Sequence, residues 1–491
     1  MIYSRYIKYL FAPCILLLFN GCAKYQFIPE PVNTNIFMSE INSWSIEDPG
    51  LNKFLEGNGI SRDLLNSRKF SIKRLYLTGL YFNPEMQTAY KKMRKAQIIF
   101  DHSDYRINPQ FSFPFEYHSD TSGGRSPWTI GAVLDFIYER KGKREARIAS
   151  AEVQLLNTRL AIDKLAIEIY TNFQRQYQAY VISQAKITEM ENEVAVLKEL
   201  LGQLQKKYEL GGASQFEIST VELELQQRKF KLSLEKNILQ EYRDNLLAMT
   251  NLAHAEYQQI EIIYEYPLAT TRALYQDHEL LKLDISQLQL KMLDNHLDMA
   301  LQLNTYAQSE ADLRLEIEKQ YPDIVLSPGF IFDQNDNIWT LGASWALPLF
   351  ENSRQNLQIL SALEERKIKQ QEIVTLQKKL LNTLYQQHQS ILRHEQTIRV
   401  SDEIIAVIEQ RASKIEEQID LGGTDNVALL RNRMEFYKAK QTQIEIYHEA
   451  INAMLDIEHL LQNSHIDLNI NHIVTSWITT IEETISNEPV H

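Results

Sequence analysis

Two sequence patterns occur twice in this chain at the same spacing, and this duplication constrains the fold more than any other feature. The pair Gly211-Gly212 recurs as Gly422-Gly423, which lies 211 residues later. The run Trp128-Thr-Ile-Gly-Ala recurs as Trp339-Thr-Leu-Gly-Ala, again 211 residues later. Two matches in one register, about 80 residues apart, indicate an internal repeat. We therefore expect two copies of one structural unit.

Each copy contains the same predicted order of elements. A helical run comes first, over residues 84 to about 106 in one copy and about 275 to 319 in the other. Strand-like segments follow, as in Trp128–Tyr138, where apolar and polar residues alternate with the period of two that is typical of strands. With residues 111–117 and the corresponding segments of the second copy, the pattern predicts four strands per chain.

A long helical stretch follows the strands of each copy. From Lys141 to about Glu209 there is no proline, and apolar residues recur at steps of three and four, as in a coiled-coil seam. At ~1.5 Å per residue, about 70 residues make a rod of ~100 Å. The helical pattern resumes after each glycine pair. Each pair is therefore predicted to form the turn of a helical hairpin, because glycine accepts a positive φ at little cost.

Long helices of an ordinary soluble bundle would show the same seam, but two features disfavour that alternative. Hairpins of this length cannot form a compact globule, and four strands cannot close a barrel around an interior. An exposed apolar face with tryptophan is typical of strands that face lipid. The residues predicted to face lipid are Trp128, Ile130, Leu134, Phe136, Trp339, Leu341 and Trp345, and those predicted to face the lumen are Thr129, Asp135 and Ser344.

The N-terminus has the pattern of an export signal. Two basic residues precede an apolar run over residues 10–19, which is too short to span a bilayer as a helix. The run leads to Gly21-Cys22, which resembles a bacterial lipobox, in which Cys22 would be diacylated and become the mature N-terminus. A plain signal peptide with an incidental cysteine is the alternative. Ala23 stands where an aspartate would tend to retain a lipoprotein at the inner membrane, so the resemblance favours the outer membrane.

Composition and motifs exclude several other classes of protein. The chain has 51 basic and 64 acidic residues, a net charge of −13, which is not the charge of a nucleic-acid-binding protein. Its 2 cysteines allow neither a zinc cluster nor a disulfide framework. No HExxH, P-loop or Gly-x-Ser-x-Gly motif occurs. We therefore expect no enzyme, no metal site and no cofactor.

The order of these elements resembles the outer-membrane efflux protein family, the TolC-like channels, over residues 80 to about 461. The run Asn83-Pro84-Glu-Met-Gln-Thr-Ala is similar to the family's opening Asn-Pro-x-Leu-x-x-Ala. Pro348-Leu-Phe350, followed by Arg354, resembles its strand-to-helix junction. The first copy departs from this pattern, because Ile137-Tyr138-Glu139 occupies the corresponding position.

The resemblance implies a mainly α fold with a small β part, in which three chains form one channel. Twelve strands would make an outer-membrane β-barrel, and twelve helices a periplasmic α-barrel. Gly211, Gly212, Gly422 and Gly423 would lie at the periplasmic tip, where an adaptor protein docks and the channel opens. The implied partners are two further copies of the chain, a periplasmic adaptor, an inner-membrane pump of the RND or ABC type, and outer-membrane lipid of a Gram-negative bacterium.

Many members of the family place aspartates just beyond the tip turns, where they constrict the entrance. The corresponding positions here are Glu217 and Thr220 in the first copy, and Ala428 and Arg431 in the second. Only Glu217 is acidic. We therefore expect these four residues to line the entrance, with a weaker acidic ring than in those members.

The predicted organisation has five parts. Residues 1–21 are a signal peptide, and residues 22–79 are an extension from the lipid anchor. Residues 80–265 and 266–463 are the two repeats, and residues 464–491 are a polar tail. The expected function is an exit duct for small molecules in a tripartite efflux system. A type I protein secretion channel is the first alternative, and a non-pore periplasmic lipoprotein adaptor is the second, although adaptors usually have only one hairpin.

Overall fold

The computed structural model describes residues 27–29, 31–120, 123–263, 283–347, 354–462 and 469–487. The chain forms two compact units, Met1–Trp44 and Ser45–His491. In the first unit, helix α2 (Thr34–Ser43) begins at Asn33, whose side chain accepts a hydrogen bond from Asn35 N–H. The signal sequence, Cys22, residues 275–282 and the segment 348–353 lie outside the described residues.

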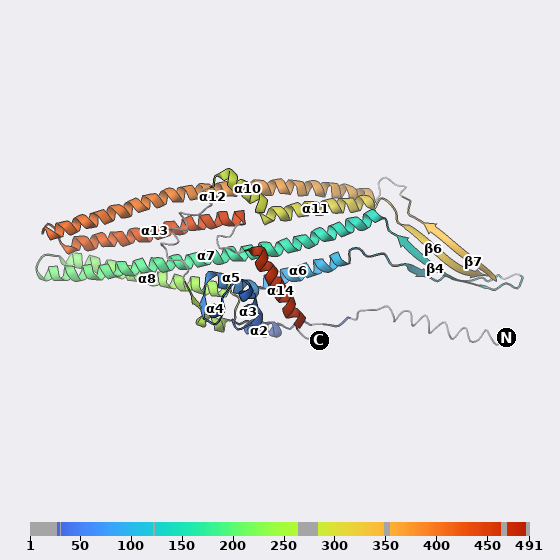
Figure 1. Cartoon of the computed structure of the whole chain (residues 1–491), viewed down its shortest axis with the longest axis horizontal. Coiled ribbons are helices and arrows are strands. Elements are labelled where there is room, and N and C mark those ends of the chain that lie inside the picture. Colours follow the sequence, from blue (N-terminus) through green and yellow to red (C-terminus); the bar gives the residue numbers. More distant parts are fainter. Residues whose placement is uncertain are drawn as a thin grey trace. The chain divides into compact units, whose positions relative to one another are not determined.

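Two long helical hairpins dominate the second unit (Figure 1). The first consists of α7 (Lys141–Glu209) and α8 (Gln215–Ala248), and the second of α12 (Arg354–Asp420) and α13 (Asn426–Leu461). α7 has 69 residues and α12 has 67, so each is ~100 Å long. The predicted hairpins and their turns are therefore confirmed.

The two hairpins pack against each other along α7 and α13. Near the glycine turns, one buried cluster joins three helices and contains Leu197 and Leu200 of α7, Val221 of α8, and Leu430 and Met434 of α13. Farther along, α12, α13 and α10 (Ile285–Asn295) share a second cluster around Met292 and Leu384. The core is thus a series of local seams between rods.

The shorter helices repeat at a different spacing from the long ones. α5 (Ile72–Tyr81) and α10 begin after Ser71 and Asp284, which cap them and lie 213 residues apart. α6 (Pro84–Asp101) and α11 (Leu297–Glu318) begin after Asn83 and His296, also 213 residues apart. The glycine pairs are only 211 residues apart. The second copy is therefore two residues shorter than the first between its short helices and its glycine turn.

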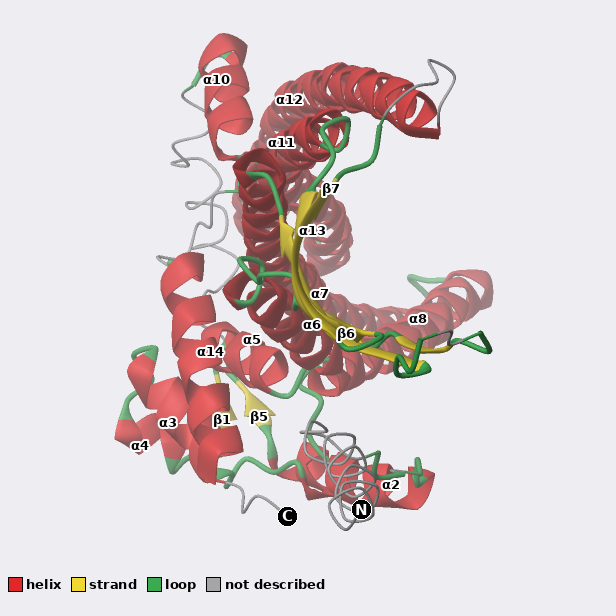
Figure 2. Ribbon diagram, turned by 90° about the vertical axis from the view of Figure 1, so that its right-hand side faces the viewer, coloured by secondary structure: helices red, strands yellow, loops and turns green. Residues whose placement is uncertain are grey.

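The larger of two sheets is antiparallel, and in it β4 (Trp128–Tyr138), β6 (Ile324–Asp333) and β7 (Asp336–Ser344) pair in that order. The predicted first strand is interrupted. It forms β2 (Gln110–Ser112) and β3 (Phe115–Tyr117), which both pair with β4 on either side of Pro114. Proline cannot donate a ladder hydrogen bond, which explains the break. The sheet is curved, and α12, α11, α7 and α8 follow an arc in the same sense (Figure 2).

A small α-rich region covers the middle of the long helices. It contains α3 (Pro49–Gly57), α4 (Arg62–Leu65), α5, the 3-10 helix η1 (His254–Gln259), and a parallel pair of β1 (Lys69–Phe70) and β5 (Glu261–Ile262). α14 (Ile470–Asn487) packs against α3 and α7. The segment that was expected to be a polar tail therefore contains a helix with an apolar face, on which Val474 and Trp477 are fully buried. No helix in the described part of the chain has an apolar stretch that could cross a membrane.

Candidate functional site: a two-faced sheet and paired helical tips

The register of the sheet places its large apolar residues on one face. Ile130 pairs with Phe115 and Phe332, Leu134 pairs with Phe111, and directly paired residues point to the same side. Along this face Trp339 is 81% exposed, whereas Phe330 and Phe332 are partly buried. The residues of this apolar face are Phe111, Phe115, Tyr117, Trp128, Ile130, Leu134, Phe136, Leu326, Phe330, Phe332, Trp339 and Leu341.

The opposite face, called the polar face below, has no aromatic residue in the described strands of this sheet. Its side chains are polar or aliphatic, and along β4 they are less exposed than those of the apolar face. At the end of the sheet that is farther from the long helices, Glu116, Thr129, Asp333 and Asp336 are paired in one row across β3, β4, β6 and β7. Thr129 donates its hydroxyl proton to Asp333 Oδ1 (2.5 Å), and its oxygen lies 2.9 Å from His118 Nε2. Because Thr129 donates its only hydroxyl hydrogen to Asp333, its oxygen accepts the hydrogen bond from His118 Nε2–H.

The residues predicted for the two sides fall on the two faces accordingly. Thr129 and Asp135 share the polar face through the alternation of β4. Ser344 pairs with Val325, which pairs with Ile137, so it shares that face too. Trp345 follows β7 and is 56% exposed. One face can therefore contact an apolar medium while the other contacts water. Which medium each face meets remains a prediction.

At the other end of the hairpins, the two glycine turns have the same backbone structure. Gly211 has φ +76° and Gly422 has φ +71°, whereas Gly212 and Gly423 do not have positive φ. Gly212 N–H donates to Lys207 O at 2.8 Å, and Gly423 N–H makes the corresponding bond at the same distance. This is the Schellman ending of a helix, which needs one residue in the left-handed region. The backbone conformation therefore favours glycine at the first position of each pair.

The helices that follow the turns begin with matched caps. Ser214 caps α8 and forms a capping box with Glu217, whose carboxylate accepts from Ser214 N–H at 2.9 Å. Asp425 caps α13 and also forms an ion pair with Lys207 of α7. This ion pair joins the tips of the two hairpins. The Ser-x-x-Glu spacing could have revealed the first cap in the sequence, whereas the ion pair depends on tertiary structure.

The four residues expected at the entrance lie in the first two turns of α8 and α13. The backbone and side-chain hydrogen bonds from Ser214 lower the pKa of Glu217, and the charges of Arg431 and Lys207 add to this effect. Thr220 donates to Phe216 O at 2.8 Å. Ala428 N–H donates to the Asp425 carboxylate. Glu217 is thus bound to its own helix terminus, and its role in lining an entrance remains a prediction.

The tips also expose apolar side chains. Leu210 is 87% exposed, Leu421 is 86% exposed, and they are equivalent residues of the two turns. Phe216, in the first turn of α8, is 79% exposed. Apolar side chains gathered at the end of a rod are typical of a contact site for another protein. Within the described ranges, no group of three or more His, Cys, Asp or Glu residues could hold a metal ion.

Comparison with solved structures identifies the fold. The outer membrane protein VceC of Vibrio cholerae is similar over 80% of this chain and 96% of its own, with 14% identity and a TM-score of 0.61. The CmeC outer membrane channel of Campylobacter jejuni covers 94% of both chains, with 12% identity and a TM-score of 0.55. The MtrE outer membrane channel of Neisseria gonorrhoeae covers 80% of this chain and 89% of its own, with 12% identity and a TM-score of 0.56.

No protein-family model matches the chain, and no curated protein matches it. At these identities the solved structures establish the fold alone. The chain has the fold of the outer-membrane channels, with helical hairpins and a small β part, as the sequence predicted.

Proposed function

We propose that this chain is one subunit of a homotrimeric outer-membrane channel, the exit duct of a tripartite efflux system that passes small molecules to the cell exterior. One observation carries the proposal: a curved sheet extends from the ends of two long hairpins, with its aromatic residues exposed on one face and its acidic residues on the other. A barrel wall in a membrane needs this division, because its outside meets lipid and its inside meets water.

The edges of the sheet support assembly with further copies. Among the described strands, β7 forms one edge, and β2 with β3 forms the other. Edge strands with exposed apolar side chains are templates for pairing with another chain. Three copies of this four-strand sheet would supply twelve strands, enough to enclose an interior.

The tips suggest where the partners would bind. A periplasmic adaptor would contact Gly211, Gly212, Gly422 and Gly423, with Leu210 and Leu421 as apolar contacts, and would connect the channel to an inner-membrane pump of the RND or ABC type. Glu217, Thr220, Ala428 and Arg431 would line the closed entrance.

Two adjacent residues of β4 test the proposed orientation of the sheet. Leu134→Arg places a charge on the apolar face, which costs ~2–4 kcal/mol near the midplane of a bilayer. We expect this variant to fail to insert as a trimer. Asp135→Arg changes charge on the polar face, so it should insert and shift ion selectivity toward anions in planar bilayers. Normal insertion of the Leu134 variant, or the absence of ion conduction by the wild-type trimer, would contradict the proposal.

The two alternatives predict different results in the same system. A non-pore periplasmic adaptor would not conduct ions in a planar bilayer. A type I secretion channel would conduct, but deletion of the gene would abolish export of a protein and leave sensitivity to small toxic compounds unchanged. The two hairpins per chain favour a channel, because adaptors usually have only one hairpin.

We also propose that Cys22 carries the lipid anchor and that residues 1–21 are removed. The basis is the apolar run that ends in Gly21-Cys22. Cys22→Ser should abolish metabolic labelling with palmitate, whereas Cys14→Ser should leave it unchanged. Labelling of the Cys22 variant at the wild-type level would disprove the assignment.

A further inference from the structure

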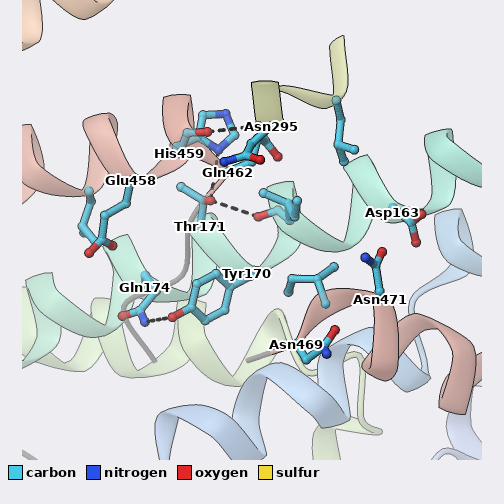
Figure 3. Close-up of a pocket in the computed structure, with 14 residues that line it drawn as sticks. Asp163, Tyr170, Thr171, Gln174, Asn295, Glu458, His459, Gln462, Asn469 and Asn471 are labelled. Carbon is cyan, nitrogen blue, oxygen red and sulfur yellow. Dashed lines mark hydrogen bonds between the residues drawn. The ribbon is translucent and has the colours of Figure 1, made fainter. Parts of the chain in front are cut away.

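The long helices of one chain form an open row. In the half that ends at the glycine turns the order is α8, α7, α13, α12, and each helix packs against the next. Inside the row the two repeats cover each other, and the polar cavity around Asp163, where they meet, is lined by residues of α7, α13, α11 and α14 (Figure 3). α8 and α12 lie at the two ends of the row (Figure 2).

α8 has a second apolar face, opposite to the one that packs in its own chain. Val221 and Leu225 are buried in the cluster that joins α8 to α7 and α13, and Leu223 lies two residues from each of them. Two residues turn an α-helix by ~200°, so Leu223 points away from the row, where it is 60% exposed. The exposed apolar residues of this edge are Leu223, Phe230, Leu234 and Ile238.

α12 has the same two-sided pattern at the other end of the row. Ile398 and Ile405 are buried, and Val400 and Val407 follow them by two residues and are 49% and 64% exposed. The exposed apolar residues of this edge are Leu392, Val400, Ile404 and Val407. Apolar residues on two opposite faces of a helix indicate that both faces are covered, so each edge fits a further helix.

The two edges match in height along the row. α8 and α13 both run away from the tips, and Arg228 of α8 donates to Gln441 of α13 at 3.4 Å. Gln443, two residues further on, donates to Asp402 of α12 at 2.7 Å. Phe230, two residues beyond Arg228, is therefore level with Asp402, in the middle of the apolar edge of α12. A rotation about an axis parallel to the rods changes no height, so the two edges would also match between copies in a ring.

The charged residues beside the two edges are complementary at these heights. Counted from the level of Phe230, Lys231 of α8 and Glu403 of α12 differ by two residues, or ~3 Å, in height. Glu241 of α8 and Arg393 of α12 differ by the same amount and in the same direction. All four residues are exposed, and none has an ion-pair partner among the described residues.

We propose that α8 of one copy packs antiparallel to α12 of the next along these edges, with Lys231 opposite Glu403 and Glu241 opposite Arg393. The inference rests on the proposed trimer and goes beyond it, because it assigns the helix contact and the charge pairs that set its register. A further copy of the chain is the partner that fits, because every chain has one edge of each kind. A head-to-tail ring therefore covers all of these edges.

Cysteine crosslinking in the purified full-length protein tests this contact. Lys231→Cys combined with Glu403→Cys should form dimers and trimers with a short bismaleimide, as seen on a denaturing gel, whereas each single variant should form none. Lys236→Cys with Arg399→Cys is the matched control at equal height. Lys236 pairs with Glu191 of α7 at 2.6 Å, so it lies on the side of α8 away from the edge, and this combination should not crosslink. Equal crosslinking of the control would overturn the proposal.

Charge reversal tests the register in the same assay. In protein that carries Glu241→Cys and Arg393→Cys, the further change Lys231→Glu places two carboxylates opposite each other and should slow crosslinking about threefold. Adding Glu403→Lys should restore the rate. An unchanged rate with Lys231→Glu, or no recovery with Glu403→Lys, would disprove the charge pairs.

Cysteines in the sheet separate a failure of this inference from a failure of the trimer. If Ser112→Cys crosslinks with Thr340→Cys but Lys231→Cys does not crosslink with Glu403→Cys, the helix contact is wrong and the trimer stands. If neither combination crosslinks, the proposed trimer is itself contradicted.

Discussion

Gly211 and Gly212 are adjacent, but the structure places different demands on them. Gly211 has a positive φ, which an L-residue adopts at a cost of roughly 1–2 kcal/mol. Gly212 does not, and a Cβ atom there would lie 3.6 Å from Lys207 O, an ordinary contact. The same distinction holds between Gly422 and Gly423. At the scale of single residues, the first glycine of each pair is therefore the one that determines the turn.

Alanine at these two positions should have unequal effects. Gly211→Ala should destabilise the end of α7 by about 1 kcal/mol, so that amides of the last helical turn exchange with deuterium several-fold faster. Gly212→Ala is the matched control and should leave exchange near the wild-type rate. Equal exchange rates at the end of α7 in the two variants would show that the turn does not need the left-handed conformation at Gly211.

Glu193 of α7 is the most buried charged residue of the first hairpin, and it has polar partners on both α8 and α13. The side chain of Glu193 is 0% exposed. Its Oε1 atom lies 2.8 Å from Arg228 Nη2 of α8, and its Oε2 atom accepts from Gln441 of α13 at 2.8 Å. Loss of one partner of a buried ion pair leaves the other charge without compensation.

We predict that Glu193→Ala destabilises the protein by about 3 kcal/mol, because Arg228 would stay largely buried without its partner. Glu224 of α8 pairs with Lys438 at the surface, so Glu224→Ala should cost about 1 kcal/mol or less. Denaturant unfolding, followed by circular dichroism, measures both. A similar midpoint for the two variants would show that losing the buried Glu193 carboxylate destabilises the protein no more than losing the exposed Glu224 carboxylate.

At the scale of elements, α5 approaches α7 and the end of α8 closely at Gly79. A Cβ atom at this position would lie 2.6 Å from Met249 O and 2.6 Å from the Phe173 ring. Gly202, two turns before the end of α7, has no atom within 4 Å of the corresponding position. Gly79 therefore allows α5 to pack against α7 and the end of α8, whereas Gly202 only weakens α7, because glycine is a poor helix former.

Alanine should accordingly have opposite effects at these two positions. Gly79→Ala should destabilise the protein by ~1–3 kcal/mol through overpacking. Gly202→Ala should stabilise it by ~0.5–1 kcal/mol, because alanine is the better helix former. The measurement is the denaturant midpoint of each variant in the same detergent. A stabilised Gly79 variant would refute the close contact between α5, α7 and α8.

At the scale of the whole molecule, the sheet has open edges and an apolar face that one chain leaves exposed. In the proposed trimer, β7 of one subunit would pair with β2 and β3 of the next. Residues on the same face of neighbouring strands have Cβ atoms ~4.5–5.5 Å apart, within reach of a disulfide, whereas residues on opposite faces do not.

Paired cysteines test this assembly. Ser112 of β2 lies on the polar face, and Ser112→Cys supplies the first cysteine of each pair. Combined in turn with cysteine at positions 338 to 342, it should crosslink into dimers and trimers only when the partner replaces Ile338, Thr340 or Gly342. Cysteine in place of Trp339 or Leu341 is the control, because those residues lie on the apolar face. Crosslinking without this alternation would contradict strand pairing between subunits.

Much of this fold follows from patterns that are local in the chain. The seam of α7, its end before Gly211 and the alternation along β4 each depend on neighbours within a few residues, so the sequence alone determined them. The apolar face of α14 is also local: Ile473, Val474, Trp477 and Ile478 recur at steps of three and four, so the sequence carries the signal for a helix where a polar tail was expected.

Contacts between distant segments were decided only by the tertiary structure. The ion pair between Lys207 and Asp425, the bond from Gln441 to Glu193 and the cavity around Asp163 all join the two repeats. Each depends on how far one rod is shifted along the other. A seam of similar apolar residues permits several such shifts at nearly equal energy. The periodicity of the sequence therefore specifies the rods, whereas the packing between them specifies which polar groups meet.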